Sequence, residues 1–253
     1  MGGFRTGGPP EGTTAIEIVK NAIDAGYRHI DTARGYGNEQ AIGRAVNDVI
    51  TEGKVNRKDI FITTKIYSKR QNVSWSRTEA LAQTRQSLTN LNMSYVDLML
   101  IHYPSNNSQL NSHVWSGLED ALNQGLVKSI GVSNFNEQQL QSLIQTANVF
   151  PAINQIESHP QLSQRQLIDY CRQFKTRVTA YSPLGAGSLI THPVLTQIGN
   201  TYNKTAVQVM LRWQIQRGVI VIPKTTKKHR MTENINLFDF SLTSQQINQI
   251  QNI

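Results

Sequence analysis

The sequence predicts an α/β fold in which a parallel sheet closes into a (β/α)8 TIM barrel, and three observations support this prediction. Short apolar or β-branched segments recur along the chain, and segments with helical periodicity lie between them. The two kinds alternate roughly every thirty residues, as βαβ units do. No linker rich in Pro, Gly or Ser and no shift in composition divides the chain. We therefore expect one domain over residues 1–253 with right-handed crossovers.

Seven segments have the composition of strands that are buried on both faces, because Val, Ile, Leu and Thr dominate each short run. They are RHID at 28–31, IFITTK at 60–65, VDLMLIH at 96–102, KSIGVSN at 128–134, AINQIE at 152–157, RVTAYS at 177–182 and VIVIPK at 219–224. A closed barrel needs an eighth strand. The remaining candidate is MGGFR at 1–5, as a truncated first strand.

Helical periodicity fills the intervals, and several of the periodic segments end at glycine, a common helix terminator. In the C-terminal segment, Leu242, Ile247 and Ile250 recur on one side, which indicates an amphipathic helix. The clearest segments are 13–26, 39–53, 77–91, 205–218 and 242–253.

Composition argues against several classes of protein. The single cysteine, Cys171, excludes a disulfide framework, and no apolar run is long enough to span a bilayer. No signal segment opens the chain, so we expect a cytoplasmic protein without a membrane partner. The net charge of +8 would attract polyanions. However, the densest basic cluster, KTTKKHR at 224–230, lacks the interleaved aromatics that stack on bases, which favours a small phosphorylated ligand over nucleic acid.

Polar side chains end the predicted strands, where a barrel forms its active site. Taken singly, they have ordinary explanations: Asp31 suits a helix cap, Lys65 a solvent-reaching side chain and His102 a core histidine. Taken together they indicate chemistry, because charged groups seldom lie beside buried strands unless they are paired. The residues concerned are Asp31, Lys65, His102, Ser133, Asn134, Asn154, Gln155, Tyr181 and Lys224.

Tyr36 follows Asp31 closely in the segment YRHIDTARGYGNE at 27–39. A phenol needs about three pKa units of help to exchange a proton near neutrality, and an adjacent ammonium favours the phenolate. We expect Lys65 to be that ammonium, Asp31 to hold it charged, and Tyr36 to reach over the barrel mouth. On its own, Tyr36 is equally typical of an aromatic residue in a turn.

These segments resemble those of the aldo-keto reductases over essentially the whole chain. GYRHIDTARGYGNEQAIG at 26–43 is similar to the family's first signature, KSIGVSNF at 128–135 to its second and IPKTTKKHRMTENINL at 222–237 to its third. ITTK, LIHYP, NQIESHP and AYSPLG fall between them in the family's order. Among members, the chain most resembles the small bacterial reductases of the 2,5-diketogluconate reductase type.

The resemblance implies that Tyr36 is the general acid that protonates a substrate carbonyl, tuned by Lys65 and Asp31, with His102 orienting that carbonyl. Tyr103 replaces the commoner tryptophan after the histidine and is expected to line the substrate pocket. The implied reaction is the NADPH-dependent reduction of small aldehydes and ketones, such as dicarbonyls and keto-sugars. No metal is expected.

The resemblance also implies where NADPH binds, and no GxGxxG motif offers a Rossmann site instead. Arginine and lysine suit the extra phosphate on the adenosine ribose, which favours NADPH over NADH. The matching positions are Ser133, Asn134 and Gln155 for the carboxamide, Tyr181 for ring stacking, Ser182, Leu184 and Gly185 for the pyrophosphate, Lys224, Thr225 and Arg230 for the ribose phosphate, and Glu233 and Asn234 for adenine.

The chain departs from the family's pattern at both ends. Only MGG matches the first strand, and no N-terminal hairpin precedes it, so either the native start lies upstream of Met1 or the expected barrel has a weak seam between its first and eighth strands. The given sequence stops at QNI, without a match to the family's long C-terminal loop. We expect an open pocket with loose substrate choice, in a monomer. Arg34, near Tyr36, would favour acidic or hydroxylated substrates if it faces the pocket, and is otherwise a surface arginine.

Two other classes of function remain open. A barrel lyase or aldolase would form a Schiff base on Lys65 and bind a sugar phosphate at the cluster from Lys227 to Arg230. A binding module would keep the nucleotide without turnover, although the presence of all four expected catalytic residues argues against this.

Overall fold

The computed structural model describes residues 14–66 and 75–253, and within them seven strands form one parallel sheet. Each strand pairs with its neighbour in sequence, in the order β1-β2-β3-β4-β5-β6-β7. All seven strand segments predicted from the sequence are confirmed. Their bounds are β1 His29–Asp31, β2 Phe61–Ile66, β3 Leu98–Ile101, β4 Ile130–Ser133, β5 Ile153–Glu157, β6 Arg177–Tyr181 and β7 Ile220–Val221.

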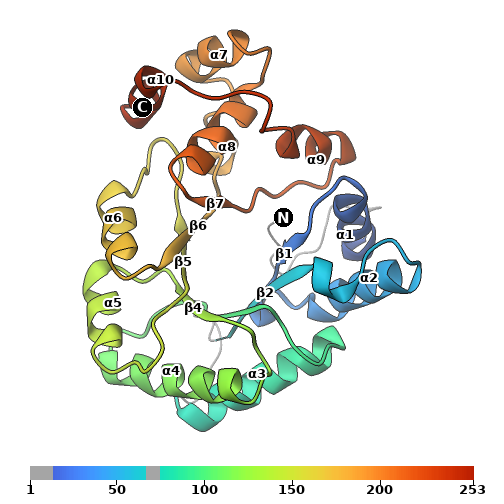
Figure 1. Ribbon diagram of the computed structural model, residues 1–253, viewed down its shortest axis with the longest axis vertical. Helices are drawn as coiled ribbons and strands as arrows, with labels where there is room; N and C mark the ends of the chain where they lie inside the picture. The colour runs from blue at the N-terminus through green and yellow to red at the C-terminus, as the bar shows by residue number, and fades with distance from the viewer. Residues whose placement is uncertain (1–13, 67–74) are drawn as a thin grey trace.

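The sheet curls so that its strands surround the centre of the molecule and the helices lie outside them (Figure 1). Helix α9 (Lys228–Ile235), late in the chain, packs against the first helix, α1 (Ala15–Asp24). Near this contact, Tyr27 Oη donates to the carbonyl of Met231 at 3.3 Å. The described residues thus form a curled parallel sheet of seven strands with helices outside it, and an eighth strand would close it into a (β/α)8 barrel. The predicted eighth strand, MGGFR at 1–5, lies outside the described residues.

The helices begin where the sequence supplies caps. Thr14, Asn136, Thr205 and Thr243 each close a capping box with the residue three positions later. No helix in the described ranges is both long and apolar enough to cross a membrane. The remaining helices are α2 Glu39–Thr51, α3 Arg77–Leu91, α4 Ser108–Asn123, α5 Glu137–Ile144, α6 Arg165–Gln173, α7 Pro193–Asn200, α8 Ala206–Gln216 and α10 Ser244–Gln251.

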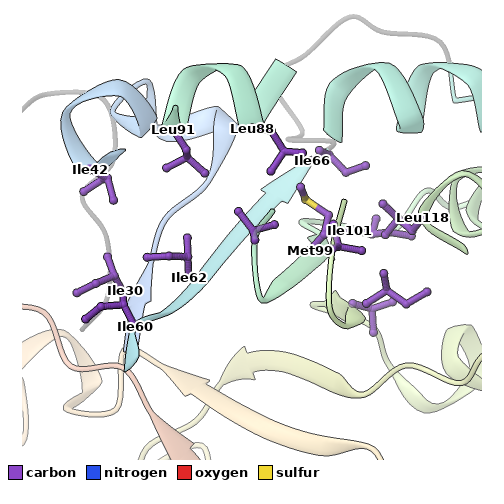
Figure 2. Packing of buried hydrophobic residues seen from close by; sticks show 14 of the residues in the cluster. Ile30, Ile42, Ile60, Ile62, Ile66, Leu88, Leu91, Met99, Ile101 and Leu118 are labelled. Carbon is purple, nitrogen blue, oxygen red and sulfur yellow. The ribbon is translucent and has the colours of Figure 1, made fainter. Parts of the chain in front are cut away.

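The main core lies between the outer face of the sheet and the helices. Ile62 and Ile66 of β2 face Leu88 and Leu91 of α3 (Figure 2). The intervening residue Lys65 points into the barrel, because successive side chains of a strand point to opposite faces. The helices therefore seal one face of the sheet with apolar contacts, while the other face is free to carry polar groups.

A second apolar cluster holds α7, α8 and α10 together beside the barrel (Figure 1). Ile250 of α10 is fully buried there and Ile247 is partly buried, as their spacing predicts. Leu242 is also buried, although it lies before α10 begins. Residues of this cluster lie on both sides of the segment 224–235 in sequence, in α8 before it and at Phe240 and Leu242 after it.

Candidate active site

A cavity of about 800 Å³ opens where the strands end, and it gathers residues from β1 through α9. Its volume lies within the roughly 300–1,000 Å³ that is typical of small-molecule sites. Most of the site residues predicted from the sequence line it. They are Asp31, Tyr36, His102, Tyr103, Ser133, Asn134, Gln155, Tyr181, Ser182, Leu184, Lys224, Thr225, Arg230, Glu233 and Asn234.

Lys65 and Asp31 form a buried ion pair in the barrel wall. Lys65 Nζ lies 2.6 Å from Asp31 Oδ1 and also donates to the carbonyl of Thr32 at 2.8 Å. Burial is the largest single effect and lowers the pKa of Lys65, but the charges of Asp31 and Tyr36 and the hydrogen bonds to them together outweigh burial and raise that pKa. Lys65 is therefore a fixed ammonium just behind the cavity, which it does not itself line.

Tyr36 lies over this ammonium, with Lys65 Nζ 5.0 Å from the centre of its ring. The short 3₁₀ turn Arg34–Tyr36 presents it, and Gly37 follows in the left-handed conformation at a φ of 69°. Burial raises the pKa of Tyr36, the charge of Lys65 lowers it, and the balance lies above the ordinary value. The sequence-based expectation of a pKa lowered toward neutrality is wrong for this structure: the phenol is protonated and suited to donate a proton.

His102 completes the group from the end of β3. Its ring meets the Tyr36 ring edge-on, with centroids 5.5 Å apart, and stacks on Tyr103 at 4.9 Å. A phenol and an imidazole thus converge on the same part of the cavity, while Tyr103 extends the wall beside them. Arg34 is not among the residues that line this cavity.

A hydrogen-bonded network forms the next part of the wall. Ser133 Oγ donates to the carbonyl of Gln155 at 2.8 Å, and Asn134 Oδ1 accepts from Tyr181 Oη at 2.8 Å. Asn134 has a φ of 64° and donates through Nδ2 to the carbonyl of His102 at 2.9 Å. The ring of Tyr181, at the end of β6, is therefore held in place by the side chain that follows β4, two strands away in the sheet.

The loop after β6 turns through several left-handed residues, with a φ of 48° at Ser182, 57° at Gly185 and 54° at Ala186. Ser182 and Leu184 line the cavity, as predicted, together with Ala186 and Gly187. Gly185 is not among the lining residues, because the turn directs it toward Ser188 and Leu189. Its assignment as a cavity contact is therefore not supported.

The far end of the cavity is cationic. Lys224 and Arg230 are exposed residues that line it on either side of the start of α9. Glu233 accepts a hydrogen bond from Thr205 Oγ1 at 2.7 Å, and Asn234 is buried beside it. An anionic ligand at this end would meet two cations at a helix N-terminus, a favourable arrangement for phosphate.

Two further results concern the faces of β5. Asn154, which the sequence grouped with Gln155, points away from the cavity and donates to the carbonyl of Phe135 at 2.9 Å. The sequence reasoning also missed Glu157, which lines the cavity two residues after Gln155. Strict alternation along the strand would have distinguished both, because residues 155 and 157 share a face that 154 does not. The other lining residues not predicted are Pro183, Ala186, Gly187, Ile190, Val207, Ile222 and Pro223.

Comparison with known proteins gives a consistent result. The aldo/keto reductase family model matches residues 1–253. The glyoxal reductase of Bacillus subtilis is 41% identical over 239 residues, which cover 94% of this chain and 83% of that protein. An oxidoreductase of the same organism, YtbE, is 44% identical over 240 residues, covering 95% of this chain and 84% of YtbE.

Among solved structures, the Bombyx mori aldo-keto reductase AKR2E4 in complex with NADP is 36% identical, with a TM-score of 0.89. That match covers 100% of this chain and 88% of the silkworm protein. A family model that spans the chain, relatives above 40% identity and a shared fold all agree. The chain therefore belongs to the aldo/keto reductase family of NADP-dependent oxidoreductases.

Proposed function

We propose that the protein reduces small aldehydes and ketones, including dicarbonyls and keto-sugars, to alcohols, with NADPH as hydride donor and Tyr36 as general acid. The observation that carries the proposal is the buried ion pair of Lys65 and Asp31 directly behind Tyr36, in a cavity that His102 also lines. The similarity to a protein named glyoxal reductase supports dicarbonyls among the substrates.

The residues present fit NADPH, which supplies a hydride when bound. Lys224 and Arg230 offer the cationic end that a ribose phosphate requires, and Thr225 lies between them in sequence. Tyr181, fixed by Asn134, offers an aromatic ring that can stack on a flat ligand. Ser133, Asn134 and Gln155 would hold a carboxamide, Ser182 and Leu184 the pyrophosphate, and Glu233 and Asn234 the adenine.

Side chains of the site hold the proton and donate it to the substrate. Tyr36 is neutral, so its hydroxyl can donate a hydrogen bond to a carbonyl oxygen in the cavity. As negative charge develops on that oxygen, the proton passes to it and leaves a phenolate beside the Lys65 ammonium. Asp31 keeps Lys65 charged and aimed, so this stabilisation is organised before the reaction. His102 contacts the same region and orients the carbonyl.

The structure disfavours a Schiff-base lyase. A lysine must lose its proton and reach the substrate to act as a nucleophile. Lys65 has a fully buried side chain, a raised pKa and two acceptors, Asp31 and the carbonyl of Thr32. It is placed to remain an ammonium.

We further propose that residues 1–253 act as a single domain and a monomer that does not bind nucleic acid. The basic cluster delivers Lys224 and Arg230 to the cavity, which supports a small phosphorylated ligand over nucleic acid. A cytoplasmic location stays a prediction from the sequence.

The test is Tyr36→Phe, assayed by NADPH oxidation with glyoxal-type dicarbonyls, aldehydes and keto-sugars. We expect turnover to fall at least about 100-fold because the general acid is removed, while NADPH binding, measured by calorimetry, stays within about threefold. Tyr202→Phe is the matched control, because its hydroxyl contacts Gln246 outside the cavity. Unchanged turnover in Tyr36→Phe would refute the assigned acid.

A further inference from the structure

Glu39, three positions after Tyr36, is a buried carboxylate that the proposed chemistry does not use. It occupies the first position of α2, where Oε1 accepts a hydrogen bond from Thr64 Oγ1 at 2.7 Å and Oε2 accepts one from Asn90 Nδ2 at 2.9 Å. In the ranges 14–66 and 75–253, no Lys, Arg or His forms an ion pair with it. Burying a carboxylate is costly without partners, so this group depends on its two neutral donors.

The two donors belong to the elements behind the catalytic group. Thr64 precedes Lys65 on β2 and faces the helices, because neighbouring side chains of a strand point to opposite faces. Thr64 is fully buried in the apolar layer that β2 shares with α3 (Figure 2). Asn90 lies in the last turn of α3. The Glu39 carboxylate therefore ties the start of α2 to the strand that carries Lys65 and to the helix behind that strand.

The connection between β1 and α2, residues 32–38, is also fixed at its other end. Lys65 Nζ donates to the carbonyl of Thr32 at 2.8 Å, and Thr32 Oγ1 donates to Asn38 Oδ1 at 2.7 Å. Tyr36 lies within the loop that these bonds close. The turn that carries the phenol is therefore placed by anchors at both of its ends.

The ammonium is held from the opposite side of the barrel as well. Lys65 Nζ lies 2.6 Å from Asp31 Oδ1, and Asp31 Oδ2 accepts from Gln155 Nε2 at 2.7 Å. Gln155 comes from β5, 124 residues further along the chain. Because this side of the ion pair does not involve α2, the separation of phenol and ammonium depends on how the Tyr36 turn is anchored.

We propose that Glu39 is a positioning residue that holds the Tyr36 phenol over the Lys65 ammonium, by fixing the start of α2 to β2 and α3. The inference rests on the proposed function of Tyr36. Lys65 Nζ lies 5.0 Å from the centre of the Tyr36 ring, and stabilisation of a phenolate by that charge falls with distance. A shift of the turn by about 1 Å is enough to reduce turnover severalfold or more.

The first experiment compares two substitutions of Glu39. Glu39→Leu removes both acceptors, so kcat should fall at least about tenfold, while NADPH affinity in calorimetry stays within about threefold. Glu39→Gln should keep kcat within about threefold, because its oxygen can accept from Thr64 and Asn90 can turn its amide to accept from the new N–H. Equal losses of kcat in the two variants would overturn the role assigned to these hydrogen bonds.

Glu119→Leu is the matched control. Glu119 is also a buried carboxylate, but it lies outside the cavity and accepts from the backbone N–H groups of Asn148 and Val149 at 2.7 and 2.9 Å. Its loss should lower the melting temperature, as the loss of Glu39 does, and leave kcat at the native value. A fall in kcat equal to that of Glu39→Leu would overturn the inference, because any buried carboxylate would then have the same effect.

Thr64→Val tests the same contact if Glu39→Leu does not fold. It keeps the shape of the side chain and removes one donor, so kcat should fall at least about threefold. Thr64→Ser keeps the hydroxyl and should stay near the native value. A native kcat in Thr64→Val would overturn the inference.

The second experiment is a double-mutant cycle with Lys65→Met. If Glu39 acts through the contact between Tyr36 and Lys65, Glu39→Leu should change kcat by less than about threefold once the ammonium is gone. Hydrogen exchange gives a readout independent of turnover: amides of residues 32–39 should exchange at least about tenfold faster in Glu39→Leu and at native rates in Glu119→Leu. Additive losses of kcat, or native exchange in Glu39→Leu, would overturn the inference.

The two proposals fail separately. Native turnover in Tyr36→Phe would refute the proposed acid, whatever Glu39→Leu does. Lost turnover in Tyr36→Phe with native kcat in Glu39→Leu would overturn the inference about Glu39 alone.

Discussion

The ion pair of Lys65 and Asp31 should respond to mutation as a unit. Both side chains are almost fully buried, with 0% and 2% exposed, so neither charge can turn to water when its partner is lost. Breaking a buried pair by removing one partner costs about 3–5 kcal/mol. At 253 residues, each kcal/mol corresponds to roughly 2–4 °C in melting temperature. Lys65→Met and Asp31→Asn should each therefore lower it by roughly 6–20 °C.

The double variant should recover most of this loss. With both charges gone, the asparagine can accept from Gln155, and methionine fills the space of the lysine stem. We expect the double variant to lie within about 2 kcal/mol of the native protein, which gives a coupling energy of several kcal/mol. Activity should not recover in the double variant, because Tyr36 lacks the Lys65 cation there as it does in Lys65→Met.

Thermal and urea unfolding, monitored by circular dichroism, measure the stabilities, and NADPH oxidation measures the activity. Tyr202→Phe serves again as the reference for a change outside the cavity. Additive losses of stability in the double variant would refute the reasoning, because they would mean that the two charges do not depend on each other. Restored turnover in the double variant would refute the role of Lys65 in stabilising the phenolate.

Three other predictions follow from the structure. Lys224→Met with Arg230→Met should weaken NADPH at least about tenfold more than NADH in calorimetry, because only NADPH carries the phosphate, and equal losses would contradict the assignment. Burial lowers the pKa of His29 to about 3. Below the unfolded pKa of about 6.5 the unfolded chain binds a proton at His29 that the folded chain does not, so the free energy of unfolding decreases as the pH falls from about 6.5 toward 3. Between pH 7 and pH 5 the free energy of unfolding of the native protein should fall by about 2 kcal/mol because of His29, and that of His29→Gln should fall by less. Equal changes in the free energy of unfolding of the two proteins would contradict this prediction. Gly43→Ala would place a Cβ 2.1 Å from a backbone carbonyl of α3 and should lower the free energy of unfolding by roughly 2–4 kcal/mol. Gly53→Ala has nothing within 4 Å of its Cβ and should lower it by only about 1 kcal/mol, because of its φ of 71°. Similar urea midpoints for the two variants would contradict the packing argument.

Local patterns in the sequence were enough for the strands, the main helices and the polar residues at the strand ends that line the cavity. Runs of Val, Ile and Thr mark buried strands, and the polar residues that end them, such as Lys65 and His102, are conspicuous because a packing core would not place them there. The resemblance to a family then extended this to residues on loops, such as Ser182 and Leu184, which periodicity alone does not identify.

The faces of the strands and the balance of energies required the tertiary structure. Asn154 and Gln155 are neighbours with similar side chains, yet only the register of β5 decides which one meets Asp31. The pKa of Tyr36 depends on its burial, which raises it, and on the charge of Lys65, which lowers it. Both effects arise only in the folded chain, where the effect of burial is the larger. The sequence by itself determined which chemical groups are available, because residue type and strand propensity are local. Which of them touch was decided by the curl of the sheet, because contacts across 124 residues have no local signature.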